Sequence, residues 1–336
     1  MSAQEEVIAF LSRAASYGAP DGRVERIESH GSLVFLHGER AYKLKRAVAY
    51  AALDYRSLSS REHACRAELR LNRRTAPQLY LDVRSINRAA DGGLRFDGGG
   101  PVLDWVVVMR RFPQTALFEN LAVAGQLTET LMERLGVEIA RFHAGAELTP
   151  QFGGPAALRL VIEENHRELC RYPDLLDPGA RDTLHRAALA ALDAQAGELD
   201  RRRREGRVRR CHGDLRLANV CLLDGRPTPF DGIEFSDRLS CIDVLHDLAF
   251  LLLDLQHHGL DALATRLLHS YLAHAGEPED CRPLPLFLSL RAATRSFTLA
   301  CSAGRQHDPA LAADKARQAR VLLERAAACL RGVDLP

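Results

Sequence analysis

Three polar side chains have the types and spacing that phosphoryl transfer requires. Asp214 and Asn219 lie five residues apart, and a short apolar run then breaks at an Asp-Gly pair (residues 224–225) that is typical of a tight hairpin turn. A second short run ends at Asp231, so we expect the hairpin to bring this carboxylate back beside the other two residues. In phosphoryl transfer one carboxylate accepts the proton of the acceptor hydroxyl, while an amide and a second carboxylate hold magnesium.

Three segments around these residues carry a family resemblance. They are Cys-His-Gly-Asp-Leu-Arg-Leu-Ala-Asn-Val (211–220), Phe-Asp-Gly-Ile-Glu-Phe (230–235) and Ile-Asp-Val-Leu-His-Asp-Leu-Ala (242–249). Together they resemble the aminoglycoside phosphotransferase family, a branch of the protein-kinase-like fold that phosphorylates small molecules. The likeness is greatest to its uncharacterised bacterial predicted kinases, which often carry a second ATPase domain. This chain contains no Gly-x-x-x-x-Gly-Lys-Ser/Thr motif, so we expect that second domain to be missing.

The resemblance implies a role for each polar residue of these segments. It makes Asp214 the catalytic base, Asn219 and Asp231 the magnesium ligands, and Asp247 a buried anchor for the catalytic loop. Arg216 stands where many relatives have His, and this departure affects the contacts to the acceptor more than the transfer chemistry. The alternative for the first three residues is a plain turn-capping role, which Asp and Asn often have.

A strand expected over residues 41–45 carries two of the three lysines of the chain, Lys43 and Lys45. Because arginine is used almost everywhere else, a retained lysine suggests a compact charge that contacts nucleotide phosphates. Solvated charges on an edge strand are the alternative. Only Lys43 has a small residue, Ala41, two positions before it, as in the Val-Ala-Ile-Lys pattern of kinases. We therefore expect Lys43 to contact the phosphates and Lys45 to lie nearer the rim of the cleft.

The pattern that follows predicts a helix over residues 59–74, opened by a capping box in which Glu62 is the cap partner. Glu68 lies in the middle of this helix. The resemblance implies that Glu68 pairs with the strand lysine, and an ordinary surface glutamate is the alternative.

Two further nucleotide contacts follow from the resemblance. Met109 ends a strand at the crossover between the lobes, where the adenine meets the backbone in this family. No Gly-x-Gly-x-x-Gly motif occurs between the first two expected strands, so only the turn at residues 30–32, with Ser32, remains to cover the phosphates. We interpret His143 and His212 as structural residues rather than ligands.

Composition excludes several other classes of protein. The 336 residues carry a formal net charge of +1, which gives no case for nucleic acid or a membrane as partner. The four arginines at 201–204 suit the carboxyl end of a helix. The eight cysteines form no Cys-x-x-Cys pair, so we expect reduced thiols in the cytoplasm and no zinc site.

The expected fold class is α+β: a bilobal protein-kinase-like fold with a small antiparallel sheet in the first lobe and a larger, mostly helical second lobe. We place the nucleotide-binding lobe at residues 1–110 and the catalytic and acceptor-binding lobe at 111–336. The expected activity is transfer of the γ-phosphate of ATP, with Mg²⁺, to a hydroxyl group of a small molecule.

Two alternatives of other classes stay open. One is a non-catalytic regulator that binds nucleotide. The other is a metal-dependent phosphohydrolase that uses His246 and Asp247 as a metal-binding pair, although neighbouring side chains on a helix point about 100° apart. Arg291, Arg295 and Arg305 lie near the expected acceptor cleft and do not suit a polycationic aminoglycoside.

Overall fold

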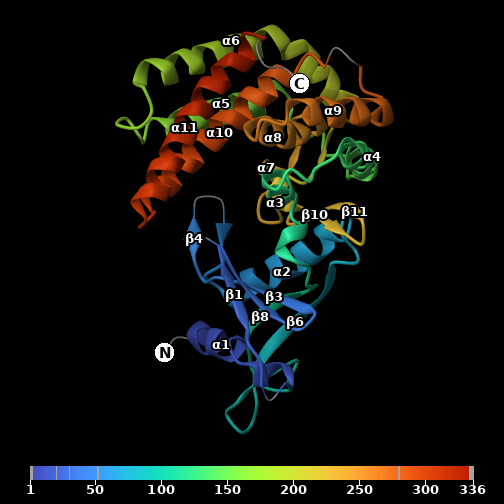
Figure 1. The fold of residues 1–336 in the computed structure, drawn as a ribbon, viewed down its shortest axis with the longest axis vertical. Coiled ribbons are helices and arrows are strands. Elements are labelled where there is room, and N and C mark those ends of the chain that lie inside the picture. The colour runs from blue at the N-terminus through green and yellow to red at the C-terminus, as the bar shows by residue number, and fades with distance from the viewer. Residues whose placement is uncertain (1–2, 20, 30, 51–52, 279–280, 333–336) are drawn as a thin grey trace. The chain divides into compact units, whose positions relative to one another are not determined.

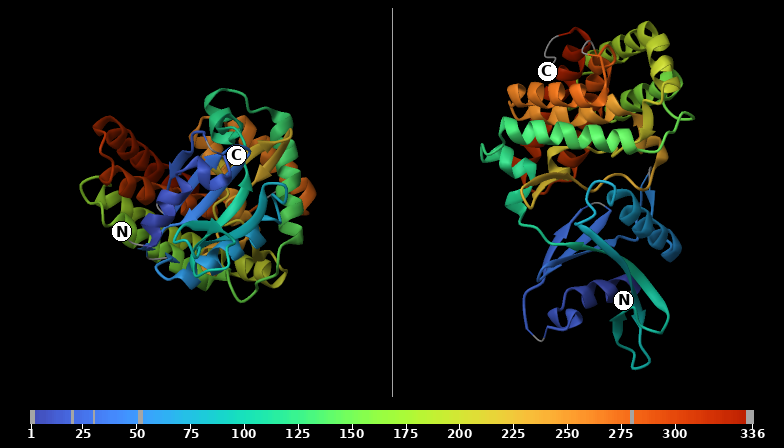
Figure 2. Two further views of the ribbon diagram at one scale, coloured as in Figure 1. Left: turned by 90° about the horizontal axis from the view of Figure 1, so that it is seen from below. Right: turned by 90° about the vertical axis from the view of Figure 1, so that its right-hand side faces the viewer.

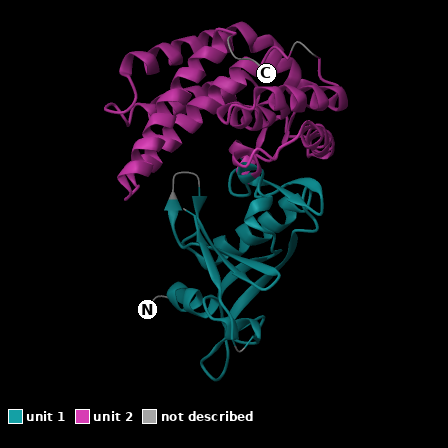
Figure 3. Ribbon diagram, in the orientation of Figure 1, with its two compact units in different colours: residues 1–120, 219–237 teal, residues 121–218, 238–336 magenta. Residues whose placement is uncertain are grey.

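The chain forms two compact units, which Figure 3 distinguishes by colour. The structure, a computed structural model, describes residues 3–19, 21–29, 31–50, 53–278 and 281–332. Unit 1 comprises Met1–Asn120 and Asn219–Asp237, and unit 2 comprises Leu121–Ala218 and Arg238–Pro336. The chain therefore passes between the units three times.

Unit 1 is built on a six-stranded antiparallel sheet (Figure 1). Its strand order is β1-β2-β3-β8-β6-β7, so β3 and β8 lie at the centre. The strands are β1 (Glu25–Glu28), β2 (Ser32–His37), β3 (Arg40–Lys45), β6 (Tyr80–Arg88), β7 (Leu94–Phe96) and β8 (Val102–Arg110). The short strands β4 (Ala49–Tyr50) and β5 (Leu53–Asp54) pair with each other beside it.

The two faces of this sheet pack against different helices because side chains alternate along β3. Tyr42 and Leu44 join the core formed with α1 (Ala3–Leu11). Lys43 and Lys45 point to the other face, where Lys43 contacts α2 (Leu58–Asn72). Central β3 thus presents one apolar face and one charged face.

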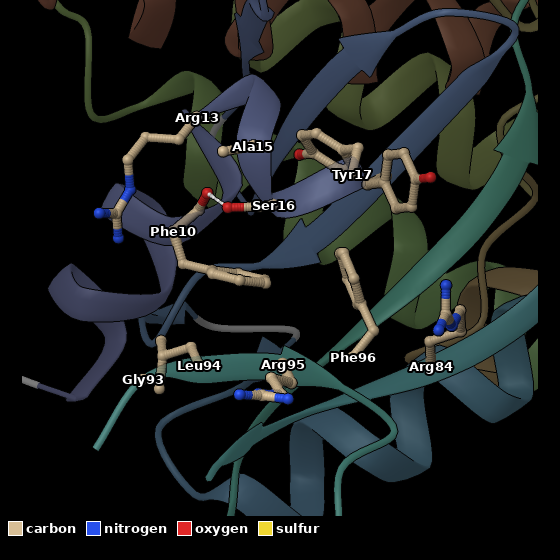
Figure 4. A pocket seen from close by; sticks show the side chains of 11 residues that line it. Phe10, Arg13, Ala15, Ser16, Tyr17, Arg84, Gly93, Leu94, Arg95 and Phe96 are labelled. Carbon is tan, nitrogen blue, oxygen red and sulfur yellow. Dashed lines mark hydrogen bonds between the residues drawn. The ribbon is translucent and has the colours of Figure 1, made fainter. Parts of the chain in front are cut away.

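A cavity of about 580 Å³ opens on the α1 face of the sheet. Figure 4 shows Phe10, Tyr17 and Phe96 pointing toward the same space. Arg84 stacks over the Phe96 ring at 4.7 Å and pairs with Asp97, so its charge is already neutralised. Because Lys43 and Lys45 lie on the opposite face, this cavity is separate from the candidate site below.

The segment 219–237 returns to unit 1 as a hairpin of β10 (Val220–Leu223) and β11 (Arg226–Pro229). Asp224 and Gly225 form its two-residue turn with φ angles of 50° and 75°, the left-handed values that the predicted Asp-Gly turn requires. Cys221 and Leu223 pack into a core with strand β8.

Unit 2 is helical around the buried helix α8 (Val244–His257), whose residues from Val244 to Gln256 are all buried. Asp243 caps this helix, and its side chain accepts a hydrogen bond from the Leu245 N–H group. Helices α10 and α11 lie side by side (Figure 2). The remaining elements are α3 (Phe118–Val123), which begins in unit 1, α4 (Glu129–Gly145), α5 (Gly154–Leu169), α6 (Pro178–Arg204), β9 (Val208–Arg210), α7 (Asp237–Ser240), β12 (Cys241–Asp243), α9 (Asp261–Ala275), α10 (Leu284–Gly304) and α11 (Pro309–Leu330).

The predicted α+β architecture, an antiparallel sheet in the N-terminal part and helices in the C-terminal part, is confirmed. The predicted capping box was wrong. Ser57 caps α2 by accepting from Ser60 N–H, so Glu62 lies five residues after the cap in place of three, and it pairs with Arg66. The predicted turn at 30–32 includes His30, which lies outside the described residues. Among the residues that are described, no helix is long and apolar enough to cross a membrane.

The division into a nucleotide-binding lobe (1–110) and a catalytic and acceptor-binding lobe (111–336) stays a prediction. The compact units divide after Asn120 instead, and unit 1 also takes in the segment 219–237. Two of the predicted site residues, Asn219 and Asp231, therefore belong to the same unit as the sheet.

Candidate active site

Lys43 joins two carboxylates on the charged face of the sheet in unit 1. Its Nζ atom donates to Glu68 Oε1 at 2.8 Å and also to Asp231 Oδ1. Glu68 comes from the middle of α2 and is fully buried, whereas Asp231 follows β11. The predicted pairing of Glu68 with a strand lysine is therefore present, and Asp231 shares that lysine.

Lys45 forms a second cluster with the same glutamate. Its Nζ atom lies 2.5 Å from Glu68 Oε2 and donates to Glu234 Oε1. Tyr55 donates its hydroxyl to Glu234 Oε1 at 2.7 Å. The position expected for Lys45 near the rim is wrong: Lys45 is 2% exposed and Lys43 is 8% exposed. Two buried carboxylates compensate the charge of Lys45, which allows it to lie deeper.

The carboxylates keep both lysines protonated. Burial alone lowers the pKa of a lysine, but Asp231 and Glu68 outweigh it and raise the pKa of Lys43 above its usual value. Glu234 and Glu68 raise the pKa of Lys45 in the same way. The face thus carries two fixed positive charges, and two of their carboxylate partners, Glu68 and Glu234, are nearly inaccessible to water.

Asp231 has a strained backbone that two polar contacts hold in place. Its φ angle of 62° is in the left-handed region, which few residues other than glycine adopt. Its N–H group donates to the Tyr80 hydroxyl at 3.1 Å, and Gly232 N–H donates to Asn72 Oδ1 at 2.7 Å. The side chain of Asp231 remains 40% exposed. Strain of this kind is frequent where a side chain must be aimed at a ligand.

The hairpin brings Asn219 and Asp231 to the same end. Phe230 N–H donates to the backbone oxygen of Asn219 at 2.9 Å, which places Asp231 one residue beyond that pair. An amide oxygen and a partly exposed carboxylate are oxygen ligands of the kind that magnesium prefers. The donor set of these two residues therefore fits a magnesium ion.

In unit 2, Asp247 fixes the loop that precedes Asp214. Its carboxylate accepts from the backbone N–H groups of His212 (3.0 Å) and Gly213 (2.8 Å). His143 contacts the same carboxylate at 3.1 Å through Nε2. Burial raises the pKa of Asp247, but the contact with His143 outweighs it, and the pKa lies below its usual range. Asp247 thus holds the loop before Asp214 in the way that the resemblance implied.

Asp214 pairs with Arg216, two residues further on. Arg216 donates from Nε to Oδ1 at 2.8 Å and from Nη2 to Oδ2 at 3.2 Å, a two-bond contact. Burial alone raises the pKa of Asp214, but Arg216, with His212 and Arg295, more than offsets this and lowers it. Asp214 is therefore ionised at neutral pH, as a proton acceptor must be.

The residues of the phosphohydrolase alternative do not converge. His246 stacks on the ring of Phe287 at 5.0 Å, whereas Asp247 binds the loop around His212. His143 is a core residue as predicted, since its Nδ1 contacts the Tyr271 hydroxyl at 2.9 Å and its Nε2 contacts Asp247.

The other two predicted nucleotide contacts lie in the sheet of unit 1. Ser32 is buried at the start of β2 and faces Lys45 in the strand register. Met109 lies on β8 opposite Ala41. Their contact with a nucleotide stays a prediction.

The sequence matches a known family over most of its length. Residues 25–284 match the phosphotransferase enzyme family (APH). The chain belongs to this family. The family that the motifs resembled is thereby confirmed.

Two related proteins and two solved structures resemble this phosphotransferase family member. The chain is 30% identical over 296 residues to uncharacterized proteins from Mycobacterium bovis and Mycobacterium tuberculosis, covering 86% of this chain but only 57% of each relative. A choline/ethanolamine kinase family protein from Mesorhizobium loti aligns with a TM-score of 0.55 at 15% identity, covering 98% of this chain and 99% of that one. A thermostable mutant of aminoglycoside phosphotransferase APH(4)-Ia, in a ternary complex with AMP-PNP and hygromycin B, aligns with a TM-score of 0.55 at 16% identity, covering 97% and 98% of the two chains. These likenesses confirm the kinase-like fold.

Sequence reasoning missed the second buried cluster, which Lys45 forms with Glu68 and Glu234. Glu234 lies three residues after Asp231 within the Phe-Asp-Gly-Ile-Glu-Phe segment, which was the available signal. Tyr55 and Tyr80 gave no signal, because only the folded chain brings them to Glu234 and Asp231.

Proposed function

We propose that this chain is an ATP- and magnesium-dependent phosphotransferase that transfers the γ-phosphate of ATP to a hydroxyl group of a small molecule. The observation that carries the proposal is the contact of Lys43 with both Glu68 and Asp231. A lysine held by a helix carboxylate and shared with a metal-binding aspartate is the arrangement that phosphoryl transfer in kinase-like folds requires.

Each predicted residue has a part in nucleotide binding. Lys43 binds the phosphates, and Glu68 holds it in position from the buried side while pairing with Lys45 through its other oxygen. Asn219 and Asp231 would hold magnesium, which when bound neutralises charge on the phosphates. Met109 on β8 and Ser32 on β2 contact the nucleotide from the sheet.

Asp214 acts as the general base in the transfer step. It accepts the proton of the acceptor hydroxyl while a bond forms between the acceptor oxygen and the γ-phosphorus. The bond from that phosphorus to the bridging oxygen breaks, and ADP leaves with the electron pair. Asp214 is ionised at neutral pH, and its release from Arg216 would raise its pKa and make it a stronger base.

The likenesses support a small hydroxylated acceptor. One solved relative belongs to the choline/ethanolamine kinase family, and another binds hygromycin B together with AMP-PNP. None of the eight cysteines, all of which lie in the described part of the chain, forms a disulfide, which suits a cytoplasmic location.

A radiolabelled ATP transfer screen tests the proposal. The acceptors are hydroxylated metabolites, sugars, aminoglycosides and protein, and Asp214→Asn is the blank. Since general-base contributions are of order 10²–10⁴, we expect Asp214→Asn to keep less than about a hundredth of the activity while Mg-ATP binding is nearly unchanged. Asp314→Asn, at an exposed carboxylate on α11, is the matched control and should keep full activity.

Tight Mg-ATP binding without transfer to any acceptor would contradict the proposal and favour a regulator that only binds nucleotide. Activity above about a hundredth in Asp214→Asn would remove Asp214 as the base.

A further inference from the structure

Two arginines flank one aromatic ring in unit 2, next to Asp214. The Cζ atom of Arg216 lies 5.7 Å from the centre of the Phe250 ring, and that of Arg291 lies 4.6 Å from it. Phe250 belongs to buried helix α8, and Arg291 belongs to α10. Two guanidinium groups from different parts of the chain thus share one ring, an arrangement that positions both of them.

Arg291 is buried with an unused donor. It is 8% exposed, and its Nε donates to the backbone oxygen of His246 at 3.1 Å. Within the described part of the chain, its Nη2 atom has no hydrogen-bond partner. Buried Arg61 and Arg202, by contrast, each pair with a carboxylate. Buried Arg181 likewise has a donor, Nε, without a partner among the described residues, so it is the position of Arg291 beside the Phe250 ring and Arg216 that matters. An anion that reached Arg291 would satisfy its costly unused donor.

The surroundings of the base are cationic. Arg216 contacts both oxygens of Asp214, and the positive charge of Arg295, one helical turn after Arg291, also acts on this carboxylate. A cationic acceptor would meet repulsion from these groups, whereas an acceptor with a negative group would meet three positive charges against the one negative charge of Asp214.

We propose that Arg216, Arg291 and Arg295, here called the arginine cluster, bind a phosphate or carboxylate group on the acceptor. The inference rests on the proposed function, since it names the class of hydroxyl compound that this site accepts. An anion that draws Arg216 away also frees the oxygens of Asp214 for the acceptor hydroxyl. Binding of the negative group and exposure of the base are therefore coupled.

Anion binding without nucleotide tests the cluster directly. Inorganic phosphate and acetate are titrated separately into the whole protein by calorimetry, with chloride keeping the ionic strength constant. We expect saturable binding of at least one of them, and the stronger of the two shows whether the group is phosphate-like or carboxylate-like. Arg291→Met should weaken that binding about tenfold or more, because a charge-assisted bond is lost.

Arg181→Met is the matched control. Arg181 is also buried in unit 2, and its Nη1 donates to the backbone oxygen of Leu169. This variant should bind the anion as the wild type does. If Arg291→Met does not fold, Arg216→Gln carries the same expectation, since Arg216 is only partly buried.

Absence of saturable binding in the wild type, or equal binding in the wild type and the cluster variants, would overturn the inference. In the transfer screen, neutral acceptors used as well as their phosphorylated or carboxylated counterparts would overturn it too. A protein that binds the anion but transfers phosphate to nothing would instead contradict the proposed function.

Discussion

Replacing each buried lysine by methionine should affect different properties. Lys45→Met should mainly lower the stability of unit 1, and Lys43→Met should mainly lower the use of ATP. Lys45→Met leaves Glu234 and Glu68, which are 4% and 0% exposed, with one positive charge fewer between them. Lys43→Met leaves Glu68 still paired with Lys45, and Asp231, at 40% exposed, can be solvated. The first change therefore leaves an uncompensated buried charge, and the second does not.

The expected losses of unfolding free energy differ accordingly. Removing one partner of a buried ion pair costs about 3–5 kcal/mol, which is the expectation for Lys45→Met. For Lys43→Met we expect about 1–2 kcal/mol, since the contact with exposed Asp231 contributes little and one hydrogen bond to Glu68 is lost. The difference is about 2 kcal/mol, or roughly thirtyfold in the folding equilibrium of unit 1.

Trp105 provides the assay. It is the single tryptophan of the chain and lies on β8, so its fluorescence during urea denaturation reports on unit 1. The measurement is made without nucleotide. Lys315→Met, at the third lysine of the chain on α11 in unit 2, is the control and should leave this transition unchanged.

The kinetic measurement should give the opposite order. Lys43→Met should lower kcat/KM for ATP by a factor on the order of 10², because its charge contacts the phosphates, and the loss should exceed that of Lys45→Met when each is measured under conditions where it is folded. Equal losses of stability in the two variants, or a larger loss in Lys43→Met, would refute the reasoning from burial.

Three other substitutions test the remaining parts of the site. Arg216→Gln removes the main influence that opposes burial at Asp214, so the pKa of Asp214 should rise and the acid limb of the pH profile of kcat/KM should move to higher pH; an unmoved limb would contradict this. Asp231→Asn should weaken magnesium-dependent ATP binding in calorimetry with little loss of stability, because asparagine tolerates a positive φ angle; unchanged magnesium dependence would remove Asp231 from the metal site. Asp247→Ala should lower the unfolding free energy by about 3 kcal/mol or more, since it leaves the buried N–H groups of His212 and Gly213 without an acceptor; chemical denaturation measures the loss, and a loss below about 1 kcal/mol would argue against the anchor.

The sequence predicted the elements that have strong local signals. The Asp-Gly turn at 224–225 forms with the expected left-handed angles, and the helix predicted over residues 59–74 forms as α2 (Leu58–Asn72). The start of α2 was misplaced because residues 57–60 contain three serines, each able to cap a helix, and the local sequence does not distinguish among them. The strands β9 and β12 were missed because they have only three residues each and pair across 30 residues of chain.

The candidate site was also predictable only in part, because some of its contacts join residues that are far apart in the sequence. The middle of the helix could be assigned to Glu68 from the sequence, and the resemblance to kinase-like folds implied its pairing with a strand lysine. Which lysine lies deeper could not be predicted, because the answer depends on Glu234, which comes from a distant part of the sequence. Since Glu68 contacts Lys45 as well as Lys43, we expect Glu68→Gln to reduce stability further when it is added to Lys43→Met.

The return of segment 219–237 to unit 1 has a consequence for synthesis on the ribosome. When residue 120 emerges, the sheet and α2 are complete, but two of the three carboxylates that neutralise the buried lysines have not yet been made. Lys43 and Lys45 then share only Glu68. Asp231 and Glu234 are synthesised only about a hundred residues later. Unit 1 therefore reaches its stable form only after much of unit 2 has been translated.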